Sequence, residues 1–99
     1  MLAEFYIAGF LEEMPVIEKE ENPTCAGWII IKVEKAFRNT DGTLPTNLLK
    51  VWMRRGCLDE CAARCTVGSP VFVCGRIESP GHEGEREVRL VGEKFKYYR

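Results

Sequence analysis

Glycine interrupts three of the five segments of this chain that resemble β-strands. Gly9, Gly75 and Gly92 each lie inside a run rich in β-branched and aromatic residues, where glycine typically marks a bulge or a sharp bend. Bends of this kind allow a small sheet to curl and close on itself. The pattern therefore favours a small closed barrel over a flat, open sheet.

The order of the predicted elements narrows the fold further. The stretch "GCLDECAARCTVG" has alanine and leucine at helical spacing and predicts a short helix over 56–68. Asp41-Gly42 predicts a turn in the polar loop that precedes the third strand, and "PGHEG" predicts a hairpin loop before the last strand. Strands are predicted at 4–18, 27–37, 47–55, 69–79 and 85–99.

Three strands, a short helix and two strands are the order of a five-stranded Greek-key barrel of the OB type. The chain has 99 residues, which suits one domain with one modest core. We therefore expect an all-β OB-fold barrel over residues 1–99, with its helix between strands three and four. No apolar run approaches the roughly 20 residues of a membrane helix, so we expect no membrane partner.

The formal net charge of −1 conceals a segregation along the chain. Residues 1–22 hold six acidic residues and one basic residue, whereas residues 23–58 hold six basic residues and two acidic ones. The sequence pI near 5.9 argues against a strong nucleic-acid binder, but local potential steers ligands more than net charge does. We expect the acids of residues 12–21 to lie away from the basic middle of the chain.

Five cysteines, an odd number, accompany an N-terminus with an early glutamate and no basic region. This combination favours reduced thiols and a cytoplasmic location, with one intermolecular disulfide as the alternative. Cys57, Cys61 and Cys65 fall at helical spacing, but about 1.5 Å of rise per residue separates the outer two by roughly 12 Å. One zinc ion with bonds of about 2.3 Å cannot span that distance, so packing against the barrel is the favoured interpretation.

Catalytic and metal chemistry finds little support in the sequence. His82, the one histidine, lies in a glycine-rich loop without an obvious nucleophile or second base nearby. We expect no catalytic residue, no metal ion and no cofactor.

The third predicted strand, "NLLKVWMRR", raises the question of which way Trp52 faces. Strand side chains alternate with a period of two, and Lys50 and Arg54 share the parity of Trp52. Burying two unpaired cations costs far more than exposing one indole, so Trp52 is predicted to face outward. The residues predicted to face inward are Leu49, Val51 and Met53.

The second predicted strand follows the same logic. Lys32 and Glu34 share the parity of Trp28, so Ile29, Ile31 and Val33 are assigned to the core. An outward tryptophan can be covered by a loop or by another protomer. It can also form an aromatic platform among cations, which is what single-stranded nucleic acid requires. The outer face predicted for the two strands comprises Trp28, Ile30, Lys32, Lys50, Trp52 and Arg54.

Four stretches resemble, in order and spacing, those of one known family. "AGFLEEMPVI" matches a G-x-L-x-x-x-P first strand, and "IIIKVEKAFRN" matches a second strand followed by an aromatic. "KVWMRRGCLDECAARCTVGSPVFVCGRI" matches the third strand, the helix and a G-x-x-V-x-V-x-G-R-I fourth strand, and "LVGEKFKYY" matches the closing strand. Over nearly its whole length the chain resembles the bacterial single-stranded-DNA-binding protein family, which has an OB fold.

That resemblance implies a set of contact residues. In the family, stacking aromatics lie on strands two and three and on the loop between them, with cations beside them. Trp28 and Lys32 join the set through strand parity, although the family is not usually aromatic at the place of Trp28. The family's aromatic at the start of strand three aligns near Leu48, which implies the loss of one stacking site. The residues carried over by position are Phe37, Lys50, Trp52 and Arg54.

The resemblance also implies a function, which is non-enzymatic binding of single-stranded DNA in replication, repair or recombination; the residues do not distinguish DNA from RNA. The chain ends at "KYYR" without the family's acidic tail, and in this it resembles the primosomal replication protein or a shortened mobile-element version. The alternative is therefore an OB-fold interaction module that uses the same face for assembly.

A homodimer or homotetramer is expected in either case. The outward side chains of the first and fourth strands include Tyr6, Ala8, Phe10 and Phe72, which are too apolar for free solvent. The first strand is also predicted to be an edge that is free to pair with another chain.

Overall fold

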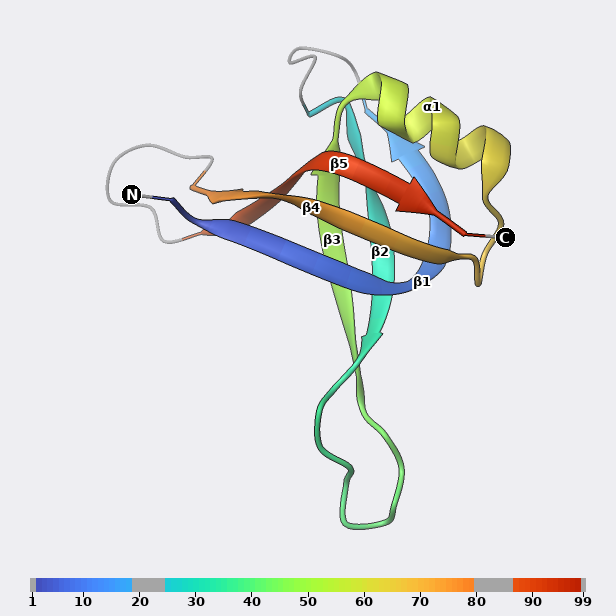
Figure 1. The fold of residues 1–99 in the computed structure, drawn as a ribbon, viewed down its shortest axis with the longest axis vertical. Coiled ribbons are helices and arrows are strands. Elements are labelled where there is room, and N and C mark those ends of the chain that lie inside the picture. The colour runs from blue at the N-terminus through green and yellow to red at the C-terminus, as the bar shows by residue number, and fades with distance from the viewer. Residues whose placement is uncertain (1, 19–24, 80–86, 99) are drawn as a thin grey trace.

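Figure 1 shows the ribbon of the computed structural model, which describes residues 2–18, 25–79 and 87–98. Helix α1 (Arg55–Arg64) lies between the third and fourth strands, as predicted, but ends earlier than expected. "PGHEG" and His82 lie outside the described residues. The strands are β1 (Glu4–Ile17), β2 (Gly27–Glu34), β3 (Thr46–Met53), β4 (Pro70–Glu78) and β5 (Arg89–Tyr97).

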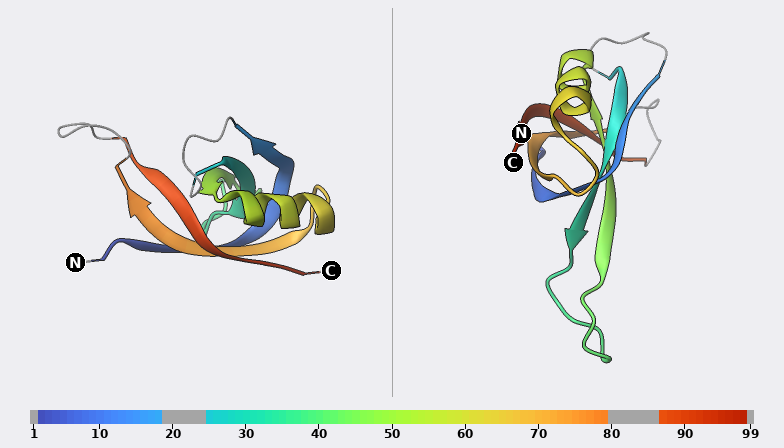
Figure 2. Two further views of the ribbon diagram at one scale, coloured as in Figure 1. Left: turned by 90° about the horizontal axis from the view of Figure 1, so that it is seen from above. Right: turned by 90° about the vertical axis from the view of Figure 1, so that its right-hand side faces the viewer.

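The strands close into a barrel in the order β1, β2, β3, β5, β4. β1 makes this closure possible, because its first half pairs with β4 and its second half pairs with β2, the change of partner falling at Phe10. Figure 2 shows β1 curling round the barrel between these two partners. The parallel pair of β3 and β5 is registered at two positions alone, Val51–Leu90 and Trp52–Val91, within the described residues. The predicted five-stranded barrel is therefore confirmed.

The core is formed by alternate residues of the strands, as the parity argument requires. Ile29, Ile31, Val51 and Met53 have no exposed surface. Each such aliphatic side chain contributes roughly 1.5–3 kcal/mol when fully buried. The predicted inward sets of β2 and β3 are confirmed, with Val33 and Leu49 partly buried against the core.

Two of the strand glycines are required by close backbone approach. A Cβ on Gly9 would overlap the carbonyl oxygen of Lys32, where β1 crosses towards β2, so Gly9 permits the predicted bend. The register irregularities of β1 lie beyond it, between Leu11 and Val16. Gly75 lies at a bulge, as predicted, opposite Gly92, and a Cβ there would overlap a β5 carbonyl.

Helix α1 packs against β1, β2 and β5. Figure 1 shows it at one end of the barrel, with the loop between β2 and β3 at the other end. Cys57, Cys61 and Cys65 are buried and unbonded, so the packing interpretation is confirmed. Burial raises the pKa of the Cys61 thiol to about 12, which keeps this thiol protonated. No helix in the described parts of the chain is long and apolar enough to cross a membrane.

Candidate nucleic-acid interface

Trp28 and Trp52 lie side by side on the outer surface of the barrel. They are direct partners in the antiparallel β2–β3 register, their ring centroids are 5.0 Å apart, and their planes meet at 62°. Both indoles are partly exposed, because the opposite parity fills the core. The outward orientation predicted for the two tryptophans is confirmed.

Lys50 lies between the two indoles and forms a cation–π contact with each of them. Its Nζ atom is 3.8 Å from the centroid of the Trp28 ring and 4.7 Å from that of the Trp52 ring. An exposed contact of this type contributes about 0.5–1 kcal/mol. Trp28, Lys50 and Trp52 therefore form one unit, which we call the tryptophan face.

Arg89 adds a second cation to this face, and sequence reasoning missed it. Its guanidinium carbon lies 4.1 Å from the centroid of the Trp52 ring. Arg89 begins β5, which the short parallel pairing at Trp52 and Val91 holds beside β3. Alternation within one strand cannot reveal such a neighbour. The available signal was the strand order of the barrel fold, which places the start of the fifth strand next to the third.

Lys32 and Arg54, both predicted site residues, flank the tryptophan face along the chain: Lys32 lies opposite Leu48 in the β2–β3 register, and Arg54 follows the end of β3. Lys32 is exposed and lines a hollow with Glu12 and Glu34. Arg54 follows β3 at the start of α1 and lines another hollow with Arg76. The expectation that the acids of residues 12–21 lie away from the basic surface is wrong for Glu12, which lines the same hollow as Lys32. Glu20 and Glu21 lie outside the described residues.

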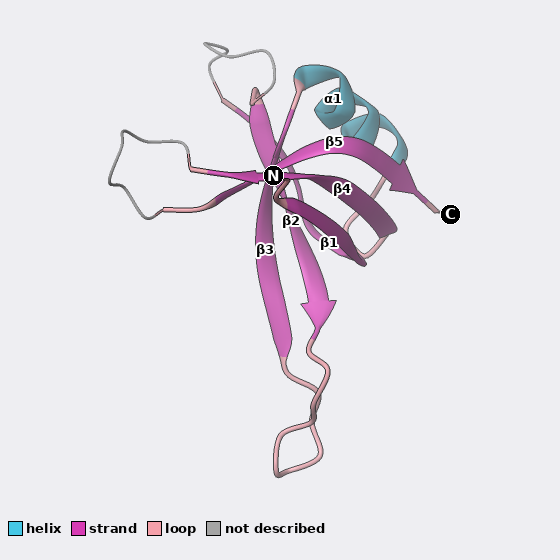
Figure 3. Ribbon diagram, turned by 60° about the vertical axis from the view of Figure 1, so that its left-hand side comes forward, coloured by secondary structure: helices cyan, strands magenta, loops and turns pink. Residues whose placement is uncertain are grey.

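Phe37 is placed on the loop of the β2–β3 hairpin, with 83% of its surface exposed. Figure 3 shows this hairpin extending beyond the rest of the barrel. β2 ends at Glu34 rather than at Phe37 as predicted, so the ring stands on the loop itself. The Phe37 ring is therefore open to solvent on the loop that extends from β2 and β3.

The tip of this hairpin is held by its own hydrogen bonds. The Thr43 amide and hydroxyl both donate to Asp41 Oδ1, at 2.9 Å and 2.6 Å, and the Arg38 guanidinium donates to the Gly42 carbonyl at 3.0 Å. The two bonds from Thr43 lower the pKa of the Asp41 carboxyl. Gly42 has a φ of 88°, which glycine adopts without strain. The loop that carries Phe37 is thus preorganised.

Leu48 lies at the start of β3, where the family resemblance implied that an aromatic residue is missing. It lies opposite Lys32 in the β2–β3 register and is 58% exposed. A leucine offers apolar contact but no ring for stacking. This end of the outer face is therefore weaker as a base platform than the end with the two indoles.

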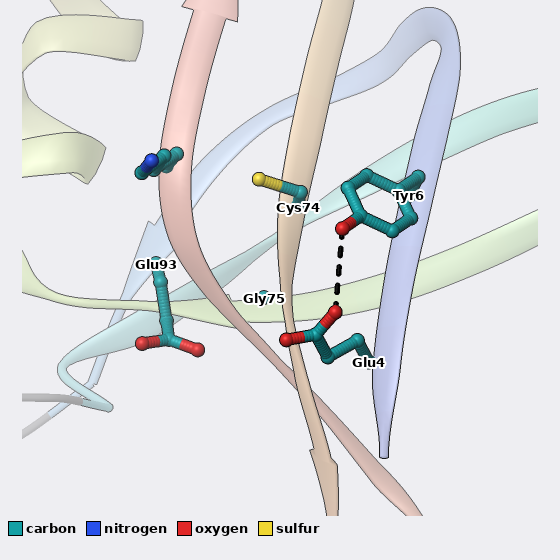
Figure 4. Close-up of a pocket in the computed structure, with 6 residues that line it drawn as sticks. Glu4, Tyr6, Cys74, Gly75 and Glu93 are labelled. Carbon is teal, nitrogen blue, oxygen red and sulfur yellow. Dashed lines mark hydrogen bonds between the residues drawn. The ribbon is translucent and has the colours of Figure 1, made fainter. Parts of the chain in front are cut away.

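The outer surface formed by β1, β4 and β5 has a different character. Figure 4 shows a hollow there, in which the Tyr6 hydroxyl donates to the Glu4 carboxylate at 3.3 Å and the Cys74 thiol and Glu93 lie nearby. The negative charge of Glu4 raises the pKa of Tyr6. Glu4 and Glu93 place two carboxylates on the lining of this hollow, together with the cation of Lys94. Within the described residues, no group of three histidine, cysteine or acidic side chains is placed to hold a metal ion.

Comparisons with known proteins extend over nearly the whole chain. No protein-family model matches it, and no curated protein matches it by sequence. The small single-stranded DNA-binding protein from Streptomyces coelicolor is similar in structure, with a TM-score of 0.65 and 18% identity over 99% of this chain and 94% of that chain. The mitochondrial single-stranded DNA-binding protein Rim1 from S. cerevisiae has a TM-score of 0.62 and 11% identity over 100% of this chain and 97% of that chain. At these identities the finding is one of fold, and this chain shares its OB-type barrel with those proteins.

Proposed function

We propose that this protein binds single-stranded DNA, without catalysing a reaction, by stacking bases on the outer face of β2 and β3. The observation that carries the proposal is the tryptophan face, in which two adjacent, partly exposed indoles share one lysine. The structural neighbours, which are themselves single-stranded DNA-binding proteins by description, support it. The proposed contacts are Trp28, Lys32, Phe37, Lys50, Trp52 and Arg54.

The energies on this face favour exchange of the lysine for a base. For each ring, a stacked base contributes roughly 1–3 kcal/mol, whereas an exposed cation–π contact contributes about 0.5–1 kcal/mol. Lys50 can leave the rings for a phosphate oxygen and keep a favourable partner for its charge. Because the ring planes meet at 62°, successive bases must tilt relative to each other to stack on both indoles.

Phe37 lengthens the proposed contact along the hairpin. Lys35 and Arg38 are exposed on the same loop and provide positive charge there. A strand that follows the hairpin thus meets an aromatic ring and cations at its tip, after the indoles and Lys50 at its base.

Tryptophan fluorescence provides the test of binding. Titration with oligo-dT is expected to quench the indoles, and the affinity is expected to fall as salt rises, with a slope of about 0.7 per phosphate contact. Oligo-rU in a parallel titration compares RNA with DNA. An unquenched signal with oligo-dT at low salt would refute the proposal.

The second candidate function is an OB-fold interaction module, and the acidic sequence pI of about 5.9 favours it. In this case the tryptophan face binds a protein partner instead of nucleic acid. The titration described above separates the two candidates, because a protein-binding face gives no salt-dependent quench with oligo-dT.

We also propose self-association into a homodimer or homotetramer. Tyr6 and Phe10 are 70% and 45% exposed, and an apolar hollow lies between Phe10, Phe72 and Tyr98. The prediction that β1 is a free edge is wrong, because β1 closes the barrel by pairing with both β4 and β2. Its first part, Glu4–Gly9, still pairs with β4 alone among the described strands. Light scattering at micromolar concentration tests this, and a monomer mass would contradict it.

A further inference from the structure

A hollow of about 290 Å³ opens beside the tryptophan face, between β3 and the start of β5. Apolar side chains, two cations and one indole line it, together with the carboxylate of Glu87. Its volume is close to the lower end of those typical for small-ligand pockets. The lining residues used below are Leu48, Lys50, Trp52, Val88, Arg89 and Leu90.

The hollow follows from the way the barrel closes. β3 and β5 are paired at Val51–Leu90 and Trp52–Val91, and the preceding part of β3, Thr46–Lys50, has no β5 partner within the described chain. β5 itself begins at Arg89, so this part of β3 extends past the start of its neighbour. Leu48 and Val88, which are 58% and 64% exposed, remain uncovered on either side of the gap.

Both cations of the hollow lie over the Trp52 ring. The Arg89 guanidinium carbon is 4.1 Å and the Lys50 Nζ atom 4.7 Å from the ring centroid. Neither cation forms a salt bridge in the described parts of the chain. Two positive charges against the one carboxylate of Glu87 leave the hollow net positive, which favours an anionic occupant next to the indole.

We propose that this hollow is a subsite for one nucleotide of the bound strand, with Arg89 as a phosphate contact. The base lies against Trp52 and the apolar lining, and Arg89 leaves the indole for the phosphate. A guanidinium donates two parallel hydrogen bonds to phosphate oxygens, a geometry that lysine lacks. This inference rests on the proposed function and extends the binding path from β2 and β3 onto the start of β5.

The proposed phosphate contact of Arg89 is tested with three variants of the full chain. Arg89→Gln removes the charge, Arg89→Lys keeps it without the guanidinium, and Arg64→Gln is the matched control on exposed helix surface. At low salt we expect Arg89→Gln to bind oligo-dT about twofold to fivefold more weakly and to reduce the salt slope by about 0.7. Arg89→Lys should restore the slope, and Arg64→Gln should resemble the wild type.

The outcomes separate this inference from the proposed function. Binding of oligo-dT by the wild type, with Arg89→Gln indistinguishable from Arg64→Gln in affinity and slope, overturns the subsite alone. Absence of wild-type binding overturns both. If Arg89→Gln fails to fold, ultraviolet cross-linking of oligo-dT to the wild type tests whether the subsite is occupied. Cross-links at Val88 or Leu90 support the subsite, and cross-links confined to other parts of the chain refute it.

Discussion

Trp52→Ala is the substitution that the proposed mechanism constrains most closely. It removes one stacking ring, so single-strand binding is expected to weaken by about 1–3 kcal/mol, which is roughly fivefold to 150-fold in Kd. Oligo-dT titration followed by the remaining Trp28 fluorescence, or by anisotropy of a labelled oligonucleotide, measures this change.

The same substitution also has a predictable effect on folding. Trp52 loses an edge-on aromatic contact with Trp28 and two exposed cation–π contacts. The aromatic contact is worth about 0.5–1.5 kcal/mol and each cation–π contact about 0.5–1 kcal/mol, so we expect the free energy of unfolding to fall by about 1.5–3.5 kcal/mol. The core beneath remains intact, and the variant should still fold cooperatively in urea.

Trp52→Phe is the matched control, because it keeps an aromatic ring at the same place. It should retain most of the affinity and most of the stability. Unchanged affinity in a folded Trp52→Ala variant would refute the stacking role. Loss of folding in both variants would show that Trp52 supports the core instead.

Three further predictions concern charge, pH and thiol reactivity. Lys50→Gln combined with Arg54→Gln should weaken binding to all sequences alike and reduce the salt slope by about 0.7 per lost contact; an unaltered slope would exclude phosphate contacts for both. Because the pKa of Asp41 is lowered in the folded chain, its bonds from Thr43 should persist as pH falls through the ordinary carboxyl range and break only below the lowered pKa, which the pH dependence of the Thr43 amide NMR signal measures. Burial raises the pKa of the Cys61 thiol to about 12, so iodoacetamide at pH 8 should label the half-buried thiols of Cys25 and Cys74 before Cys61. Mass spectrometry measures the labelling, and equal labelling of the three thiols would contradict this packing.

Side-chain alternation predicted which side chains of β2 and β3 face the core and which face outward. It separated inward Ile29 and Val51 from outward Trp28 and Trp52 because a strand has only two faces, and unpaired charges are costly to bury. The glycines indicated closure for a similar reason, since Gly75 marks the bulge that the barrel requires. These features depend on a few neighbouring residues and are visible in the sequence.

Features set by strand pairing could not be predicted in this way. The contact between Trp28 and Trp52 depends on the β2–β3 register, which alternation does not specify. Arg89 reaches Trp52 because β3 and β5 are parallel neighbours over a very short length. Glu12 shares a hollow with Lys32 because β1 changes partner from β4 to β2 near its middle. Each of these contacts joins residues that are distant in sequence.

The central claim is that bases stack on the tryptophan face. Its most direct test is the pair of indole Nε1–H signals in a ¹H–¹⁵N correlation spectrum, recorded while oligo-dT is added at low salt. The account predicts that both signals shift together and saturate with the fluorescence quench, while the amide signals of residues 61–64, at the end of α1 far from Arg54, stay in place. Indole signals that remain unmoved while the oligonucleotide binds would contradict it.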